Sequence, residues 1–176
     1  MGGSVPRGLP NFQFASFLAG VLILLGGAAC VVLTSPQLRR APTSLPVIGG
    51  REVSAALVIP LCAAPTLLGG LYAIIHGIGG MVTKLLGLLG IVEIPFPAEA
   101  WVTVDMVALS LWDLLFYEPW FLAMGLCLLL SLRSYALDKG VRPGAVRAAG
   151  RACAALVAVG SAGFMWMIVT DNVVVI

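Results

Sequence analysis

Long apolar windows separated by short polar connections are the dominant pattern along the chain. A membrane-spanning helix needs about 20 apolar residues, because it rises 1.5 Å per residue through about 30 Å of hydrocarbon. Four windows meet this length, at about residues 12–34, 54–76, 118–137 and 150–171. The sequence therefore predicts an all-α integral membrane protein, a four-transmembrane-helix bundle that forms a single domain over residues 1–176.

Polar residues and prolines mark where these windows begin and end. The first window stops at Pro36, because proline cannot continue the interior of a helix, and His76 closes the second window. Glu118 and Pro119 are typical of a helix start, since proline is tolerated at the first helical position. We therefore expect the second span to end at His76 and the third span to begin at Glu118.

The stretch between the second and third spans is apolar but repeatedly interrupted. Its two helical segments, at about residues 80–92 and 100–116, are separated by the helix breaker Pro95-Phe96-Pro97. Both segments carry charges and are short for a span, so we expect one or two interfacial helices that lie on the membrane or cap the bundle. The alternative is that Trp101–Tyr117 forms a fifth, re-entrant segment.

Two prolines, Pro60 and Pro65, lie inside the second span. Each proline removes a backbone hydrogen bond and clashes with the preceding turn, so a kink is expected here. In lipid the freed carbonyl groups need new partners, which Thr66 or a neighbouring helix would have to supply. Two interpretations remain open: a hinge of the kind that a transporter uses, or a permanently bent structural helix.

The composition excludes an ordinary soluble domain. Hydrophobic residues make up 60% of the chain and charged residues only 10%, whereas a soluble domain has about 25% charged residues. The net charge of +2 is too small for a general nucleic-acid binder, so we expect no nucleic-acid partner. The expected surroundings are the lipid bilayer and other membrane protein subunits.

The distribution of charge predicts an orientation. The first and third connections contain Arg39, Arg40, Arg51, Arg133, Lys139, Arg142, Arg147 and Arg151. These eight basic residues and two acidic ones give that side a charge of +6, while two basic and six acidic residues give the other side −4. The positive-inside rule then places both termini outside. The excess of Arg over Lys is typical of a GC-rich genome and favours a bacterial plasma membrane, with the mitochondrial inner membrane as the alternative.

Few residues can carry chemistry. The sequence lacks the common nucleophile, zinc and phosphate-loop motifs, so we assign no catalytic residue, cofactor or metal site. The remaining functional candidates are His76, Asp105, Asp113 and Glu118. Asp105 and Asp113 are eight residues apart and about 80° apart on a helix, so they can share one face. The plainer interpretation is a polar cap for His76 and a water-facing surface for the carboxylates.

These features favour a non-catalytic accessory or scaffolding subunit of a larger membrane protein complex, such as a respiratory or transport assembly. Small residues at Gly69, Gly70, Gly160 and Gly163 provide faces on which helices can approach closely, within the chain or between chains. The first alternative is a small transporter or lipid-handling membrane protein, which the prolines of the second span favour. The second alternative is a membrane enzyme that uses His76 and the outer carboxylates.

The predicted orientation is tested by labelling with a membrane-impermeant thiol reagent in intact cells. In a chain without native cysteines, probes introduced as Gly3→Cys or Val174→Cys are expected to react from outside, because the charge asymmetry holds the basic connections inside. If the probes introduced as Ala41→Cys or Gly140→Cys reacted from outside instead, this orientation would be contradicted.

Overall fold

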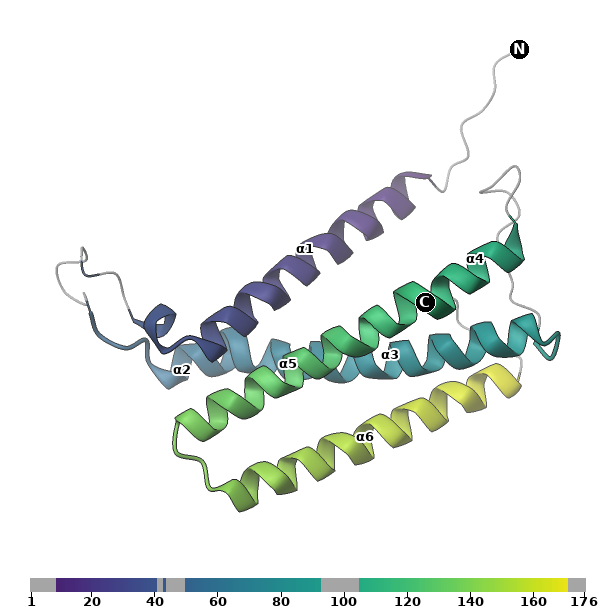
Figure 1. Ribbon diagram of the computed structural model, residues 1–176. Helices are drawn as coiled ribbons and strands as arrows, with labels where there is room; N and C mark the ends of the chain where they lie inside the picture. The colour runs from purple at the N-terminus through teal and green to yellow at the C-terminus, as the bar shows by residue number, and fades with distance from the viewer. Residues whose placement is uncertain (1–8, 41–42, 44–49, 93–104, 171–176) are drawn as a thin grey trace, which may run out of the picture.

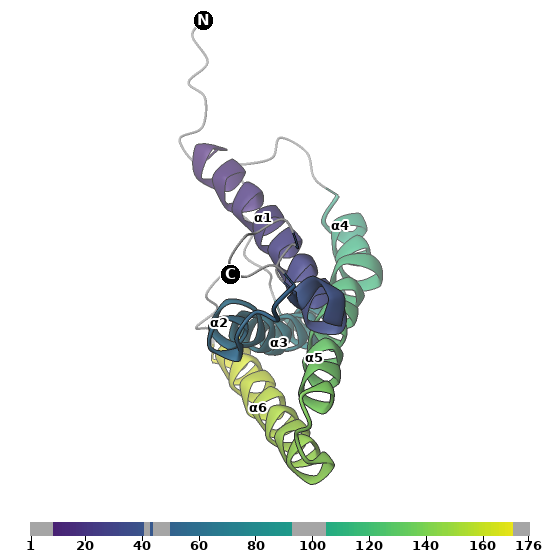
Figure 2. The same ribbon diagram turned by 90° about the vertical axis from the view of Figure 1, so that its left-hand side faces the viewer.

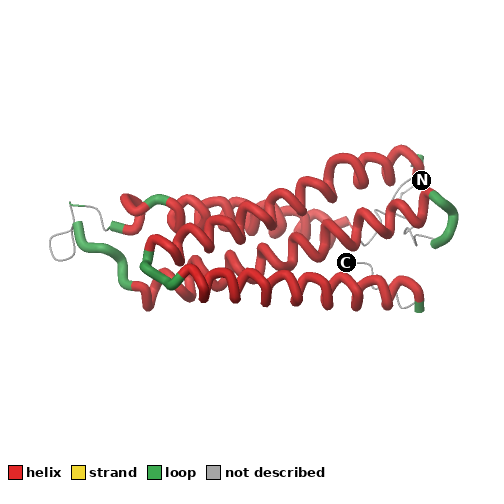
Figure 3. The backbone as a smooth tube through the Cα atoms, turned by 60° about the horizontal axis from the view of Figure 1, so that its bottom comes forward, coloured by secondary structure: helices red, strands yellow, loops and turns green. Residues whose placement is uncertain are grey.

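A computed structural model describes residues 9–40, 43, 50–92 and 105–170 of the protein. Over these residues the backbone is helical, apart from short connections and one antiparallel bridge between Arg40 and Glu52 (Figure 3). The all-α prediction is therefore confirmed for the part of the chain that the structure describes. The elements are α1 (Leu9–Thr34), the 3₁₀-helix η1 (Pro36–Arg39), α2 (Ala55–Val58), the π-turn η2 (Ile59–Ala63), α3 (Ala64–Leu88), α4 (Met106–Trp112), the π-turn η3 (Asp113–Tyr117), α5 (Glu118–Asp138) and α6 (Pro143–Val169).

Three helical stretches are long and apolar enough to cross a membrane: Ala55–Leu88, Val107–Asp138 and Pro143–Ile168. The first runs without a break through α2, η2 and α3, and the second runs through α4, η3 and α5. In α1 the apolar stretch that can be assessed, Gly20–Thr34, is shorter. The architecture is thus compatible with an integral membrane protein, and a fourth span at α1 stays a prediction.

The predicted helix boundaries around the central connection are wrong. The second helix does not end at His76 but continues to Leu88, so residues 80–88 are not a separate interfacial helix. The third helix does not begin at Glu118, because α4 and η3 lead into α5 without a break. The physical reason is that charged residues near these positions find partners across the helix pair and do not have to end the helix at water.

Parts of the sequence-based predictions lie outside the described residues. They are the first part of the helix expected at 100–116, the end of the span expected at 150–171, and the breaker at Pro95-Phe96-Pro97.

Each of the two long helices contains a π-turn that ends two residues before a proline. In each turn the last N–H before the proline donates to the carbonyl five residues earlier; the pairs are Ala64 to Ile59 and Glu118 to Asp113. Pro65 and Pro119 follow, and neither has an N–H to donate. The wider turn relieves the clash that a proline ring causes in an α-helix, so both helices pass through their prolines.

The irregularity predicted at Pro60 and Pro65 corresponds to η2, which contains the first of these prolines. The suggestion that Thr66 supplies a hydrogen bond to a freed carbonyl is wrong. Its side chain is only 2% exposed, and its hydroxyl oxygen has no hydrogen-bond partner. The change of helix type therefore accommodates Pro65 without help from Thr66.

The helices α3 and α5 form a central antiparallel pair, with α1 and α6 on opposite sides of it (Figures 1 and 2). Glycines set the separation of the pair. A Cβ added at Gly125 would lie 2.6 Å from Cγ1 of Ile74 and 2.8 Å from the carbonyl oxygen of Gly70. One added at Gly77 would lie 2.9 Å from the carbonyl oxygen of Glu118. A larger residue at either glycine would force the helices apart.

The packing of α6 on α3 also depends on two glycines. A Cβ at Gly160 would lie 2.6 Å from Cδ1 of Ile75, and one at Gly79 would lie 2.5 Å from the ring of Phe164. Each helix thus receives a large side chain of the other in a notch. Over its apolar part, α6 has a smaller share of buried residues than either of the other two candidate spans, Ala55–Leu88 and Val107–Asp138.

Ion pairs around Tyr135 hold one end of the bundle together. Arg39 donates to Asp138 at the end of α5, and its guanidinium carbon lies 5.2 Å from the centre of the Tyr135 ring. Lys139 donates to Glu52, and this hydrogen bond is the main cause that lowers the pKa of Glu52 below its usual value. The first and third connections are therefore in direct contact.

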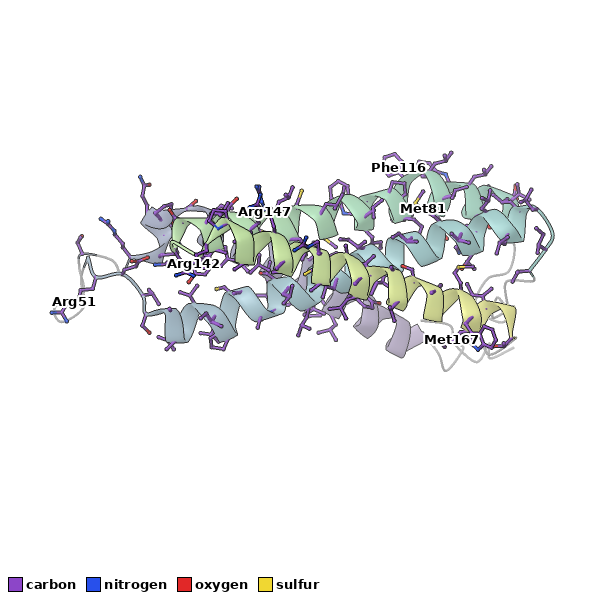
Figure 4. All side chains as sticks on the ribbon, turned by 90° about the horizontal axis from the view of Figure 1, so that it is seen from below. Arg51, Met81, Phe116, Arg142, Arg147 and Met167 are labelled. Atoms are coloured by element: carbon purple, nitrogen blue, oxygen red, sulfur yellow. The ribbon has the colours of Figure 1, made fainter. Side chains whose placement is uncertain are left out.

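Basic side chains gather at this same end, which we call the basic end. Figure 4 shows Arg51, Arg142 and Arg147 there, while Phe116 and Met167 lie toward the opposite end. The predicted grouping of the first and third connections on one side agrees with this placement. The orientation of that side in a membrane stays a prediction.

Candidate functional site

Four ionisable side chains meet between the two central helices, away from the basic end. His76 and Lys84 come from α3, Asp113 from η3 and Glu118 from α5. We call these four residues the α3–α5 polar cluster. Three of the four predicted candidates, His76, Asp113 and Glu118, are brought together here, and Lys84 joins them.

The face that α3 contributes follows from its regular spacing. His76, Gly80 and Lys84 are separated by four residues each, so they lie one above another along one side of an α-helix. Gly80 leaves open space between the two charged or polar side chains. This face therefore presents an imidazole, a gap and an ammonium group in order.

The π-turn η3 aligns the two acidic residues opposite that face. In a regular α-helix Asp113 and Glu118, five residues apart, would point about 140° away from each other. In η3 the N–H of Glu118 instead bonds to the carbonyl of Asp113, so one turn separates the two residues. Both carboxylates can then face α3, and each reaches a different partner there.

Lys84 and Asp113 form a close ion pair. The Nζ atom of Lys84 lies 2.7 Å from Oδ2 of Asp113, and each side chain is about one-fifth exposed (20% and 21%). A lysine–aspartate pair that is fully exposed to water contributes about 0–1 kcal/mol to stability. Here most of both side chains is shielded from water, so removal of one partner would leave the other charge poorly solvated.

Glu118 is the most buried acid of the cluster. Only 6% of the residue is exposed, and its Oε2 atom is buried without a hydrogen-bond partner. Its carboxyl group fills the space above Gly80: the three atoms nearest to a Cβ added at Gly80 all belong to this group. The absence of a side chain at position 80 is therefore what lets Glu118 turn toward α3.

His76 is the nearest partner of Glu118. Its Nε2 atom lies 3.9 Å from Oε2 of Glu118, which is beyond hydrogen-bond distance. The imidazole ring is half-buried and lies between Tyr72, stacked with ring centres 5.7 Å apart, and Phe121, edge-on at 4.8 Å. The ring is thus held beside the carboxyl group in a mostly apolar environment.

Asp105 does not belong to the cluster. It is the N-cap of α4, where its side chain accepts hydrogen bonds from the backbone N–H groups of Val107 and Ala108. The face that it was expected to share with Asp113 does not form, because Asp105 has an extended backbone and precedes the helix. Its observed role is to begin α4, which is the usual role of Asp at this position.

Two residues are not among the functional candidates that the sequence predicted: Lys84, which belongs to the cluster, and Gly80, which makes room for it. The four-residue spacing of His76, Gly80 and Lys84 was visible and could have indicated a polar stripe on one helix. The alignment of Asp113 with Glu118 was not visible, because it depends on the π-turn.

The chain matches no protein-family model, no curated protein and no solved structure. What the cluster can do is therefore argued from its own geometry.

The fit of the Glu118 carboxyl group over Gly80 is tested by a double-mutant cycle. Gly80→Ala is expected to destabilise the protein by about 1–3 kcal/mol, because the new methyl group overlaps the carboxyl group. In a Glu118→Ala background the same change should cost little, since the overlap is gone and alanine favours a helix over glycine. Unfolding in mixed detergent micelles measures both values.

Gly163→Ala is the matched control, because no atom lies within 4 Å of a Cβ added there. It should leave the free energy of unfolding nearly unchanged in both backgrounds. An equal cost of Gly80→Ala with and without the Glu118 carboxyl group would contradict the described fit.

Proposed function

We propose that the protein is a non-catalytic subunit held against other proteins within a membrane complex. The observation that carries this proposal is the outward face of α6. Leu156, Val159 and Trp166 are 57%, 71% and 70% exposed, and Gly163 lies among them on the same side of the helix. A large apolar face with a small residue in it fits the close approach of another transmembrane helix.

The arrangement of the four helices adds support. α1 and α6 are on opposite sides of the α3–α5 pair and leave much of their surface uncovered (Figure 2). Buried hydrophobic side chains are few in the described part of the chain, and one cluster of them, which includes Leu33 and Tyr135, lies near the basic end. Lipid can cover such a surface, and partner helices would cover it with better fit.

The proposal includes the finer features of the predicted topology. All four long helices cross the bilayer, both termini lie outside, and the basic end faces the cytoplasm of a bacterial cell. Alternation of helix direction along the chain supports this topology, because the connections after α1 and α5 lie at the same end (Figure 1). The partners are the lipid bilayer and other membrane protein subunits.

A small transporter is the second candidate, and the buried carboxyl group of Glu118 favours it. Asp113 and Arg133 are twenty residues apart, which is about 30 Å of helix and matches the hydrocarbon thickness. With these charges at the two membrane surfaces, Glu118 lies about 7 Å inside. Ionisable groups at such depths often mark pathways for ions or substrates.

The subunit proposal predicts different effects for two glycines of α6. Gly163→Leu should leave the stability of the isolated chain nearly unchanged, because the site is open, but should reduce co-purification of partners in mild detergent several-fold. Gly160→Leu should destabilise the isolated chain itself, because Ile75 fills that notch. Thermal unfolding and quantitative mass spectrometry of the purified complexes measure the two effects.

Two results would contradict the proposal. One is that the chain purifies from native membranes as a stable monomer with no partner. The other is that Gly163→Leu leaves its set of partners unchanged. Solute flux through vesicles that contain only this chain, abolished by Glu118→Gln, would favour the transporter.

A further inference from the structure

The charges of the α3–α5 polar cluster divide into two unequal pairs. Lys84 and Asp113 neutralise each other at 2.7 Å. Glu118 and His76 are then left to balance their own charge. Without a bound proton this second pair carries one negative charge, with one proton it is neutral, and with two it carries a positive charge.

Among the residues that the structure describes, no other charge compensates Glu118. The charged or titratable groups that face it are His76 and Lys84 from α3 and Asp113 from η3, and the lysine is already paired. From α6, the apolar ring of Phe164 lies against α3 at Gly79, next to Gly80. The remaining titratable groups of the elements packed around it lie at the helix starts, on exposed surface or toward the basic end; they include Asp105, Tyr117, Cys127, Arg133, Arg151 and Cys153.

An unpaired carboxylate at this position would be costly. The residue is 6% exposed, and Oε2 is buried and has no hydrogen-bond partner. Ionised groups removed from water are unfavourable unless an opposite charge or several donors surround them. The geometry therefore demands either a proton on Glu118 or a positive charge on the facing imidazole of His76.

We propose that Glu118 and His76 form a proton-binding site that holds one proton at neutral pH. The ligand is a proton taken from water, and the two atoms that can carry it are Oε2 of Glu118 and Nε2 of His76. These atoms are 3.9 Å apart, so a small rotation of either side chain brings them into hydrogen-bond distance. The site belongs to the chain itself and does not depend on the proposed partners.

Transfer within the site keeps charge and atoms balanced. When the O–H bond of the protonated carboxyl group breaks, its electron pair stays on the oxygen and gives a carboxylate. The proton forms an N–H bond with the lone pair of Nε2, which gives an imidazolium ion. The pair is neutral overall before and after the step, and no other reactant is required.

The composition of the chain makes this site directly measurable. His76 is the single histidine, so nitrogen-labelled histidine reports on one ring only. The chain has four glutamates, and in carbon-labelled protein the carboxyl signal of Glu118 is identified by its proximity to the labelled imidazole. The measurement uses the full chain in phosphatidylcholine vesicles at pH 7, by solid-state NMR.

One proton on the pair is the expected result. Either the Glu118 carboxyl signal is that of a protonated acid and His76 is neutral, or the carboxyl group is ionised and His76 is an imidazolium ion. An ionised carboxyl group beside a neutral imidazole would overturn the proposal, and so would a protonated acid beside an imidazolium ion. Because this readout uses the wild-type chain, it does not depend on the folding of any variant.

Two variants sharpen the assignment, with infrared spectroscopy of the carboxyl groups and NMR of the imidazole. If the acid holds the proton, Glu118→Gln removes one protonated-carboxyl band; if the imidazole holds it, the same variant converts the His76 signal to that of a neutral ring. Glu52→Gln is the control, since Glu52 is exposed and paired with Lys139 at the basic end. Glu52→Gln should change neither signal. The proposal would be overturned if the Glu118→Gln variant gave the same spectra as the wild type.

Discussion

The close contact between α3 and α5 is the interaction on which the rest of the structure depends. Glycines at positions 77 and 125 let the two backbones approach to a distance at which a larger residue would overlap the facing helix. Packing of this kind is effective in lipid, where helices gain little from burying apolar surface and associate through close fit. α1 and α6 then attach to the pair from opposite sides, and the polar cluster lies inside the contact.

The π-turns determine which side chains enter that contact. At Pro119 the helix continues through a wider turn, and the extra residue in that turn rotates everything beyond it. In η3 this rotation places Asp113 above Glu118, toward α3. The π-turn that accommodates Pro119 therefore also positions the two acidic residues of the polar cluster. The proline and the two acids are parts of one local structure.

The sequence predicted the class of the fold well and the polar site only in part. Long apolar windows are a property of local composition. Helices long enough to span a membrane could therefore be predicted without knowing which helices they pack against. The end of α3 and the start of the continuous stretch through α4, η3 and α5 were misplaced, because His76 and Glu118 resemble helix ends when read alone. Their partners lie on another helix, and periodicity within one segment cannot reveal them.

The polar residues differ in how far local signals determine them. Asp105 is a helix cap, and its preference for that position is a local property that a sequence can show. Asp113 and Glu118 face the same side because of an i to i+5 hydrogen bond. This bond changes the rotation per residue from that of a regular α-helix, which sequence patterns assume. Gly80 looks like one of many glycines until the carboxyl group above it is known.

The central claim is that α3 continues unbroken past His76 with its polar face against α5. Spin labels placed singly at residues 77–88 of the chain in lipid bilayers test it, by the ratio of their accessibility to oxygen and to a water-soluble nickel chelate. A continuous helix predicts a depth that changes steadily from residue 77 to residue 88, modulated by a period of about 3.6 residues. A constant depth over residues 80–88 would show a helix lying along the membrane surface and would contradict the claim.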